Sequence, residues 1–200
     1  MNASHSTKPP KYGDSGPASL RSILESKSIP KVGFDIRAAS KLLFRDFNVS
    51  LNGIYDLQLM ELASRDRHQS KKHLAGFAKC VDQDVPKSKA TKCRWLQPDD
   101  STNMHLFNTL GRAPYMKRVE LYPALWEVYR QRLSLPGQAF WLSSARLESW
   151  QRVQDSKRGK SLGPMCWWDS ELLESTMESW NEGIFTEHMA GGCELNEDAE

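Results

Sequence analysis

One segment, Lys31–Ile36, alternates apolar and polar residues as a strand does when one of its faces is buried. Val32, Phe34 and Ile36 would share that face, which makes the segment the best strand candidate in the chain. A lone strand is not a stable unit, because a sheet needs hydrogen-bonded neighbours. Either further strands are hidden in less regular segments, or the sheet partners of this strand are missing from the chain.

Helical spacing of apolar residues is far more frequent, and it predicts six helices: Ser19–Leu24, Arg37–Phe47, Ile54–Ala63, Val119–Leu133, Ser144–Ser156 and Asp169–Trp180. Pro123 implies that the helix containing it begins or bends nearby. In the fifth helix Leu147, Trp150 and Val153 form the apolar stripe, so we expect these side chains to face the core. Lys87–Asp100 has almost no apolar period and is expected to be a loop.

Composition divides the chain into three parts. Residues 1–17 are rich in Pro, Ser, Gly and Lys and are expected to be a disordered lead-in, and residues 169–200 an acidic helix with a disordered tail. Residues 18–168 are the expected folded domain. No stretch approaches the ~18 apolar residues of a spanning helix, and the first residues lack the apolar core of a signal peptide. We therefore expect an intracellular protein, cytoplasmic or nuclear, with no membrane partner.

Charge is distributed unevenly along the chain. Arg65–Trp95 contains nine basic and three acidic residues, whereas Asp169–Glu200 contains ten acidic residues and no Lys or Arg. A basic stretch can follow a phosphate backbone. The alternative is a solvated loop surface. The candidate contacts to single-stranded RNA or DNA are Arg65, Arg67, Lys71, Lys72 and Lys79.

Two of the seven tryptophans stand out as a candidate site. Trp167 and Trp168 are adjacent and precede the acidic helix, so they could form an exposed patch for a protein partner or the lid of the core. Trp126 and Trp150 fall on apolar stripes and are expected to be core residues instead.

The four cysteines, Cys80, Cys93, Cys166 and Cys193, form no Cys-x-x-Cys pair. Without a secretory signal they are expected to stay reduced. A zinc site that combined the first two cysteines with His68 and His73 would not match the spacing of common zinc fingers. We therefore expect no structural metal.

Several short motifs together resemble one known family. The most specific are Lys31–Arg37, then Leu42–Phe44, then Ile54–Ala63, and further matches lie at Gly76–Cys80, Leu106–Asn108, Pro123–Trp126, and at Arg152, Val153 and Ser156. From about Leu20 to Trp168 the chain resembles the 3'-5' exonuclease domains of the DEDD superfamily, on the RNase D side. More narrowly, it is similar to the fungal Egalitarian-like exonuclease-domain proteins. The resemblance implies an α/β, RNase H-like exonuclease fold, incomplete at its N-terminus and rich in helices toward its C-terminus.

In that family four carboxylates hold two divalent cations, Mg²⁺ or Mn²⁺, which generate the attacking hydroxide and stabilise the leaving oxygen. The first two ligands belong to an Asp-x-Glu motif upstream of Lys31, and residues 1–30 contain none, which implies a truncated domain. The third position falls on Ala39. The fourth belongs to a Tyr-x3-Asp motif, which the simplest alignment deletes between Arg118 and Val119.

The resemblance therefore implies that none of the four ligand positions is filled and that this chain holds no catalytic metal. Glu120 and Asp56 are the available substitutes, although Asp56 matches a position that more often begins a helix or supports the framework. Three hypotheses remain open. The chain could be a degenerate exonuclease domain that still binds nucleic acid, a protein-interaction module, or a truncated gene product that does not fold alone. Whether it is an enzyme stays uncertain from the sequence.

Overall fold

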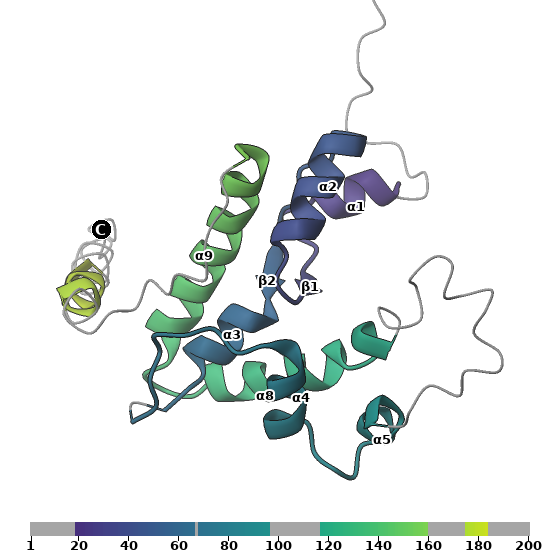
Figure 1. Cartoon of the computed structure of the whole chain (residues 1–200). Helices are drawn as coiled ribbons and strands as arrows, with labels where there is room; N and C mark the ends of the chain where they lie inside the picture. The colour runs from purple at the N-terminus through teal and green to yellow at the C-terminus, as the bar shows by residue number, and fades with distance from the viewer. Residues whose placement is uncertain (1–18, 67, 97–116, 160–174, 184–200) are drawn as a thin grey trace, which may run out of the picture.

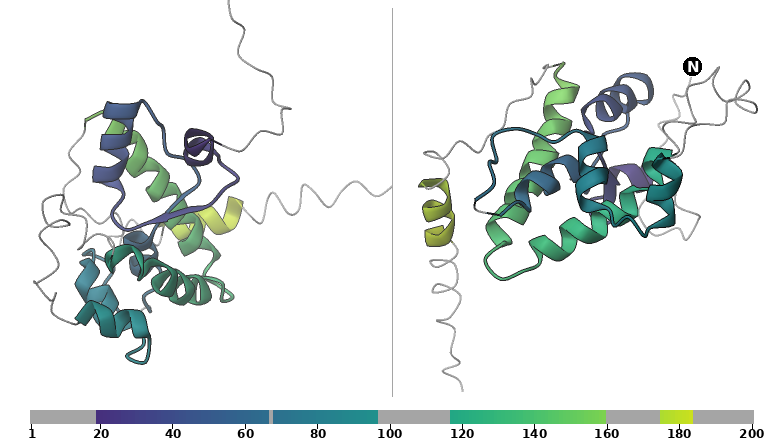
Figure 2. Two further views of the ribbon diagram at one scale, coloured as in Figure 1. Left: turned by 90° about the vertical axis from the view of Figure 1, so that its right-hand side faces the viewer. Right: turned by 60° about the horizontal axis from the view of Figure 1, so that its bottom comes forward.

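The computed structural model describes residues 19–66, 68–96, 117–159 and 175–183 (Figure 1). Residues 175–183 are helical. The other elements are α1 (Leu20–Glu25), β1 (Lys31–Gly33), α2 (Arg37–Phe47), β2 (Ile54–Asp56), α3 (Leu57–Ala63), α4 (Phe77–Asp84), α5 (Ala90–Leu96), α8 (Tyr122–Leu133) and α9 (Ala139–Lys157). The longest helix, α9, packs against α2, α3, α8 and β2, and the views of Figure 2 show it beside α2.

The sheet consists, in the described residues, of two parallel strands, with Lys31 opposite Ile54 and Gly33 opposite Asp56. Helix α2 connects them, so the unit is a β–α–β crossover. The second strand lies at the start of a segment that the sequence predicted to be entirely helical. That prediction is wrong for Ile54–Asp56, because the helical period of Leu57, Met60 and Ala63 belongs only to the part that follows.

The first strand is shorter than its alternating pattern predicts. It ends at Gly33, and Asp35 takes a left-handed conformation with φ of 50° before α2 begins. The Asp56 carboxylate explains this turn. Its Oδ1 accepts the Asp35 N–H at 2.9 Å and its Oδ2 accepts the Ile36 N–H at 3.1 Å. A side chain from the neighbouring strand therefore bends β1 out of the sheet.

The main core lies where α3, α4 and α8 meet. All seven residues of α3 are buried. Phe77 of α4 packs edge-to-face against Phe34 and Trp95, with ring centroids 5.1 and 5.3 Å apart. Tyr129 of α8 is fully buried in the same cluster. Burial of this apolar surface is the main force that holds the short elements together.

Two predictions from helical periodicity are corrected by the structure. The predicted loop Lys87–Asp100 contains helix α5. On α9 the stripe of Leu147, Trp150 and Val153 is not a buried face, since Leu147 is 66% exposed and Trp150 47% exposed, and only Val153 is buried. The buried face of α9 instead carries residues that are mostly small or polar: Phe140, Ala145, Ser149, Arg152, Val153, Asp155 and Ser156.

Other predicted elements agree with the structure. Helices α1 and α2 match their predicted segments closely, and Ser19 caps α1 by accepting the Ser22 N–H. Helix α8 begins at Tyr122, so Pro123 lies in its first turn as expected. Trp180, in the helical residues 175–183, packs against Phe140 at 5.7 Å.

Several predictions concern residues outside the described part of the chain. The lead-in of residues 1–17, Arg67, the pair Trp167 and Trp168, and the tail after residue 183 all fall there. In the part that is described, no helix combines the length and the apolar character that crossing a bilayer requires.

Candidate functional site

A buried polar network surrounds Asp56 at the end of β2. Asp56 is completely buried, and its carboxylate accepts four hydrogen bonds. Two come from the turn at Asp35 and Ile36, a third comes from the Gln58 N–H at 3.0 Å, and the fourth comes from Arg152 Nη1 at 2.6 Å. The Gln58 bond is the N-terminal cap of α3, so the prediction that Asp56 begins a helix is confirmed.

The network joins segments that lie far apart in the sequence. Arg152 comes from the buried face of α9, where its side chain is 4% exposed, and it also donates to Gln58 Oε1 at 3.2 Å. Ser149, one turn earlier on α9, accepts the Asp56 N–H at 3.1 Å. Gln58 in turn donates to the Ala75 carbonyl at 3.0 Å. The network therefore fixes α9 and the chain at Ala75 against the carboxyl end of β2.

All four good acceptor positions of the Asp56 carboxylate are occupied by protein donors, so this group is committed to the framework. A metal ion would have to displace one of these buried donors, at the cost of leaving it unsatisfied. The geometry thus gives Asp56 a supporting role and not that of a substitute ligand.

The other two positions that matter for the metal chemistry do not complete a set of ligands. Ala39 lies in the first turn of α2, where its methyl group is exposed, and Glu120 is exposed in the turn before α8. In the described ranges, no three His, Cys, Asp or Glu side chains come close enough together to hold a metal ion. These residues do not fit a two-cation centre, which needs a cage of hard oxygen ligands.

Asp35, four residues before Ala39 in the sequence, pairs with two arginines. Burial alone would raise its pKa, but the hydrogen bond and charge of Arg37 and the charge of Arg152 outweigh burial and lower the pKa of this carboxyl. Arg37 Nε lies 2.5 Å from Asp35 Oδ1, and Arg152 Nη1 lies 3.8 Å from it. The carboxylate therefore belongs to the rim of the Asp56 network.

The candidate nucleic-acid contacts divide into buried and exposed side chains. Arg65 forms a two-point pair with Glu61 at 2.8 and 2.7 Å, and its Nη1 donates to the carbonyls of Ser70 and His73 at 2.6 and 2.9 Å. Arg65 therefore links the loop after α3 to that helix through hydrogen bonds.

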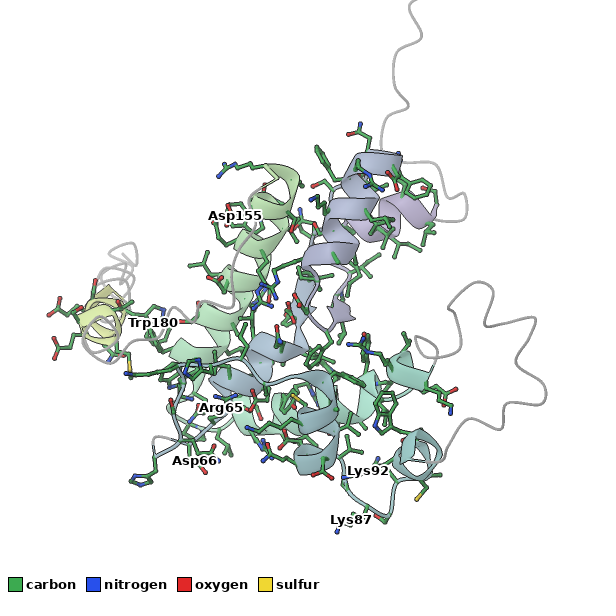
Figure 3. The ribbon with its side chains drawn as sticks, in the orientation of Figure 1. Arg65, Asp66, Lys87, Lys92, Asp155 and Trp180 are labelled. Atoms are coloured by element: carbon green, nitrogen blue, oxygen red, sulfur yellow. The ribbon has the colours of Figure 1, made fainter. Side chains whose placement is uncertain are left out.

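Lysines from the basic stretch also hold helix ends. Lys71 is 9% exposed, and its Nζ donates to the carbonyls of Leu62, Ala63 and Arg65, at the end of α3. Lys92 is 1% exposed and donates to the carbonyls of Asp82 and Val85, at the end of α4. A cation at a helix C-terminus satisfies carbonyls that have no intrahelical partner. Figure 3 shows where Arg65 and Lys92 lie in the fold, and the nitrogen atoms of both side chains donate to acceptors within the protein.

Lys72 and Lys79 are the members of the predicted set that lie exposed in the described residues, and Arg67 lies outside them. Fewer cationic side chains of the basic stretch are therefore exposed than its charge indicates. No periodic signal in the sequence marks which lysines turn inward. The resemblance had marked Arg152 and Ser156, but it assigned them no role.

The geometry above defines a helix-rich α/β fold with a parallel strand pair joined through a helix. No family model matches the chain, and no curated protein matches it. Two solved structures of Trypanosoma brucei RNase D are similar in fold, one described as a complex with RNA U12 and one as a GMP complex.

The first likeness has a TM-score of 0.50 at 19% identity and covers 72% of this chain and 48% of the RNase D chain. The second has a TM-score of 0.50 at 15% identity and covers 76% and 46%. The chain therefore spans about half the length of these RNase D structures. At these identities the likeness shows the fold alone: the chain shares the RNase D exonuclease fold over the matched part.

Thiol reactivity tests the packing of α4. Burial, and next the charge of Glu61, raise the pKa of the Cys80 thiol to about 12, whereas Cys93 is exposed. In a variant with Cys166→Ser and Cys193→Ser, we expect one thiol to react rapidly with a thiol reagent near about pH 8 and the other only after unfolding. Adding Cys93→Ser should abolish the fast reaction. Two fast thiols in the native protein would contradict the packing.

Glu148, on α9, provides a test of charge near the Asp56 network. Burial raises the pKa of its carboxyl; Arg152 opposes this effect, and the charges of Asp155 and Asp56 add to it. A carboxyl with a raised folded pKa contributes stability below its unfolded pKa of about 4.3 and loses that contribution as pH rises through the folded pKa. We expect Glu148→Gln to raise the melting temperature at neutral pH, and the gain to shrink in acid. Glu127→Gln, exposed on α8, is the control, and a lower melting temperature for Glu148→Gln at neutral pH would contradict this reasoning.

Proposed function

We propose that this chain is a nucleic-acid-binding module built on the exonuclease fold, which binds single strands and does not hydrolyse them. The observation that carries the proposal is the exposed methyl group of Ala39 at the position where the resemblance puts a metal ligand, inside an otherwise matching block. The carboxylate of Asp56, which the sequence offered as a substitute ligand, is occupied by hydrogen bonds within the fold. In this proposal the matched block keeps residues that build the fold, whereas Ala39 stands where a carboxylate would bind a cation.

Two observations support binding. The fold is shared with RNase D, which is described in complex with RNA. The described surface also carries exposed cations, among them Lys79 and Lys27. In this proposal the protein acts inside the cell, in the cytoplasm or nucleus, as a degenerate relative of the Egalitarian-like exonuclease-domain proteins that uses no Mg²⁺ or Mn²⁺ of its own.

The test is an incubation of the purified full chain, in excess, with labelled single-stranded RNA and DNA in Mg²⁺ or Mn²⁺. We expect the strands to stay full length and their fluorescence anisotropy to rise with protein concentration, less steeply as salt increases. A ladder of shorter products that disappears with Glu120→Gln would overturn the absence of hydrolysis. A flat anisotropy curve for both strands at low salt would overturn the binding.

A further inference from the structure

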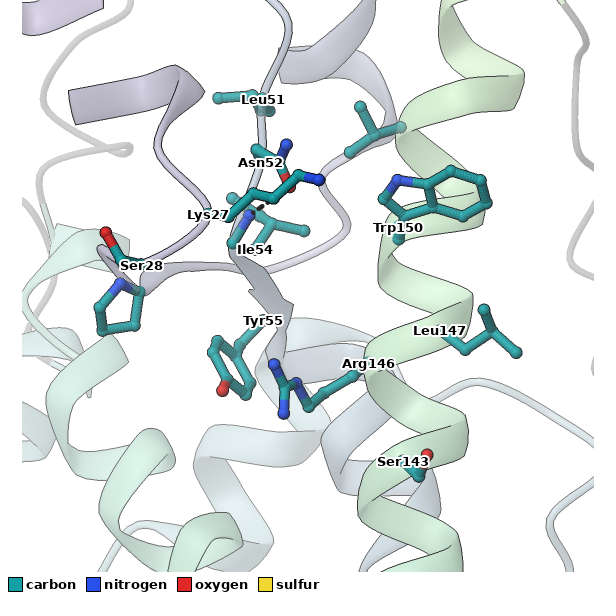
Figure 4. A pocket seen from close by; sticks show the side chains of 13 residues that line it. Lys27, Ser28, Leu51, Asn52, Ile54, Tyr55, Ser143, Arg146, Leu147 and Trp150 are labelled. Carbon is teal, nitrogen blue, oxygen red and sulfur yellow. Dashed lines mark hydrogen bonds between the residues drawn. The ribbon is translucent and has the colours of Figure 1, made fainter. Parts of the chain in front are cut away.

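Two open pockets among the described residues are similar in size but differ in charge. The first, here called the β2–α9 pocket, has a volume of about 620 Å³ and lies between β2, the loop before β1, and α9 (Figure 4). Lys27 and Arg146 line it, and none of the described residues around it is acidic. The second pocket, about 790 Å³ beside α3 and α8, is lined by Glu61, Asp66 and Asp84 as well as by cations.

In the second pocket the arginines are already neutralised. Arg65 pairs with Glu61 at 2.7 Å, and Arg132 pairs with Asp84 at 2.8 Å. In the β2–α9 pocket, by contrast, neither Lys27 nor Arg146 has a carboxylate partner among the described residues. Charge complementarity therefore favours an anion in the β2–α9 pocket and not in the second one.

The same pocket holds an exposed aromatic plane. Trp150 is 47% exposed, although it belongs to the longest helix of the fold. It is turned outward because the opposite face of α9 carries Ser149 and Arg152, whose hydrogen bonds to Asp56 fix the rotation of the helix. An indole held at a pocket wall by a rigid helix can stack on a planar ring with little loss of entropy.

The two cations reach the pocket from different elements, Lys27 from the loop before β1 and Arg146 from α9. The Arg146 guanidinium lies over the Tyr55 ring, 5.3 Å from its centroid, which pre-orients it. The backbone at Lys27 lies close against Gly53, where a Cβ would be 2.9 Å from the Lys27 carbonyl. Figure 4 shows the two side chains reaching toward the pocket from opposite walls, with Trp150 on the α9 side.

We infer that the β2–α9 pocket binds a single-stranded nucleic acid, with a base stacked on Trp150 and the backbone phosphates at Lys27 and Arg146. A duplex fits less well, because its bases are stacked inside and not available to the indole. An apolar peptide would gain nothing from two cations that have no carboxylate partner among the described residues. The inference rests on the proposed function and gives it a binding surface away from Ala39 and from the basic stretch.

The test is the affinity of the full chain for a fluorescein-labelled single strand of about twelve nucleotides, measured by anisotropy over a range of salt. We expect Trp150→Ala to weaken binding at least about five-fold and Trp150→Phe to retain most of it, because a base can stack on either ring. Arg146→Gln and Lys27→Gln should each reduce the steepness of the salt dependence by about 0.7 in the log–log slope.

Matched controls separate this site from the alternatives. Arg130→Gln on α8 and Lys41→Gln on α2 remove exposed cations outside the pocket and should leave the slope unchanged. Leu147→Ala removes an apolar group that lines the pocket, 66% exposed, and should change the affinity less than two-fold. Equal losses for Leu147→Ala and Trp150→Ala, with the slope unchanged by Arg146→Gln, would mean an apolar occupant and would overturn the inference.

Failure of the inference can be told apart from failure of the proposed function. If Lys72→Gln and Lys79→Gln weaken binding while Trp150→Ala and Arg146→Gln do not, the strand lies on the basic stretch, and the pocket assignment is wrong although binding stands. If the unmodified chain binds neither RNA nor DNA, both proposals fail. Circular dichroism of each variant shows that a lost affinity is not lost folding, and Arg146→Gln, exposed at the surface, is expected to fold normally.

Discussion

Arg152→Met is expected to reduce the free energy of unfolding by about 3–5 kcal/mol, because it leaves the buried Asp56 carboxylate without its counter-charge. The pair has the features that make such a loss large. Asp56 is 0% exposed, the Arg152 side chain is 4% exposed, and the two are joined at 2.6 Å. Methionine keeps much of the apolar stem of arginine, so the loss would reflect charge more than volume. Equilibrium unfolding in urea measures it.

Comparison of two further variants identifies the cause of that loss. Arg37→Met removes a pair with Asp35 whose side chains are 26% and 37% exposed, and it should cost less than about 1 kcal/mol. In a double variant, Arg152→Met with Asp56→Asn, we expect a smaller loss than the sum of the two single ones, because no unpaired charge remains. A cost below about 1 kcal/mol for Arg152→Met would contradict the role given to the Asp56 network.

Lys71→Met is expected to reduce the free energy of unfolding by about 2–3 kcal/mol without weakening oligonucleotide binding. The ammonium group donates to three carbonyls at the end of α3, and the residue is only 9% exposed. Hydrogen bonds to a charged group, together with the favourable position at a helix C-terminus, account for the size of the effect. Urea unfolding and anisotropy on the same preparation measure both quantities.

The neighbouring residue serves as the control. Lys72 is exposed, so Lys72→Met should change stability by no more than about 0.5 kcal/mol. If Lys71→Met instead leaves stability unchanged and weakens binding, Lys71 contacts phosphate, and the assignment of this lysine to the fold is wrong.

Local sequence signals were enough to predict those helices whose start is marked by their own residues. Ser19 marked the start of α1, and Pro123 marked the start of α8. The second strand was missed because three residues are too few to show a period, and because its neighbour is brought to it by a helix crossover. Phe34–Ile36 was predicted as strand since its pattern continues, whereas a carboxylate from β2 bends the backbone there.

Long-range partners explain the errors at the candidate site. Periodicity alone predicted a buried Trp150, but the buried polar face of α9 is fixed by Asp56, which lies 93 residues from Ser149. Charge counting left open whether the basic stretch binds phosphate or is a solvated loop surface, because it cannot distinguish an exposed lysine from one such as Lys92 that caps a helix. The lack of a carboxylate at position 39, in contrast, could be inferred from the sequence, because the resemblance to the exonuclease family aligns Ala39 with a metal ligand.

The most direct test of binding without hydrolysis is a time course of fluorescence anisotropy, with the full chain in excess over a labelled single strand in Mn²⁺. We expect the anisotropy to rise on mixing and then to stay constant, since the strand remains bound and intact. Unlabelled competitor added at the end should return the signal to that of the free full-length strand. A signal that rises and then decays toward that of short fragments, with a decay slowed by Glu120→Gln, would contradict the proposal and show that the chain is an active nuclease.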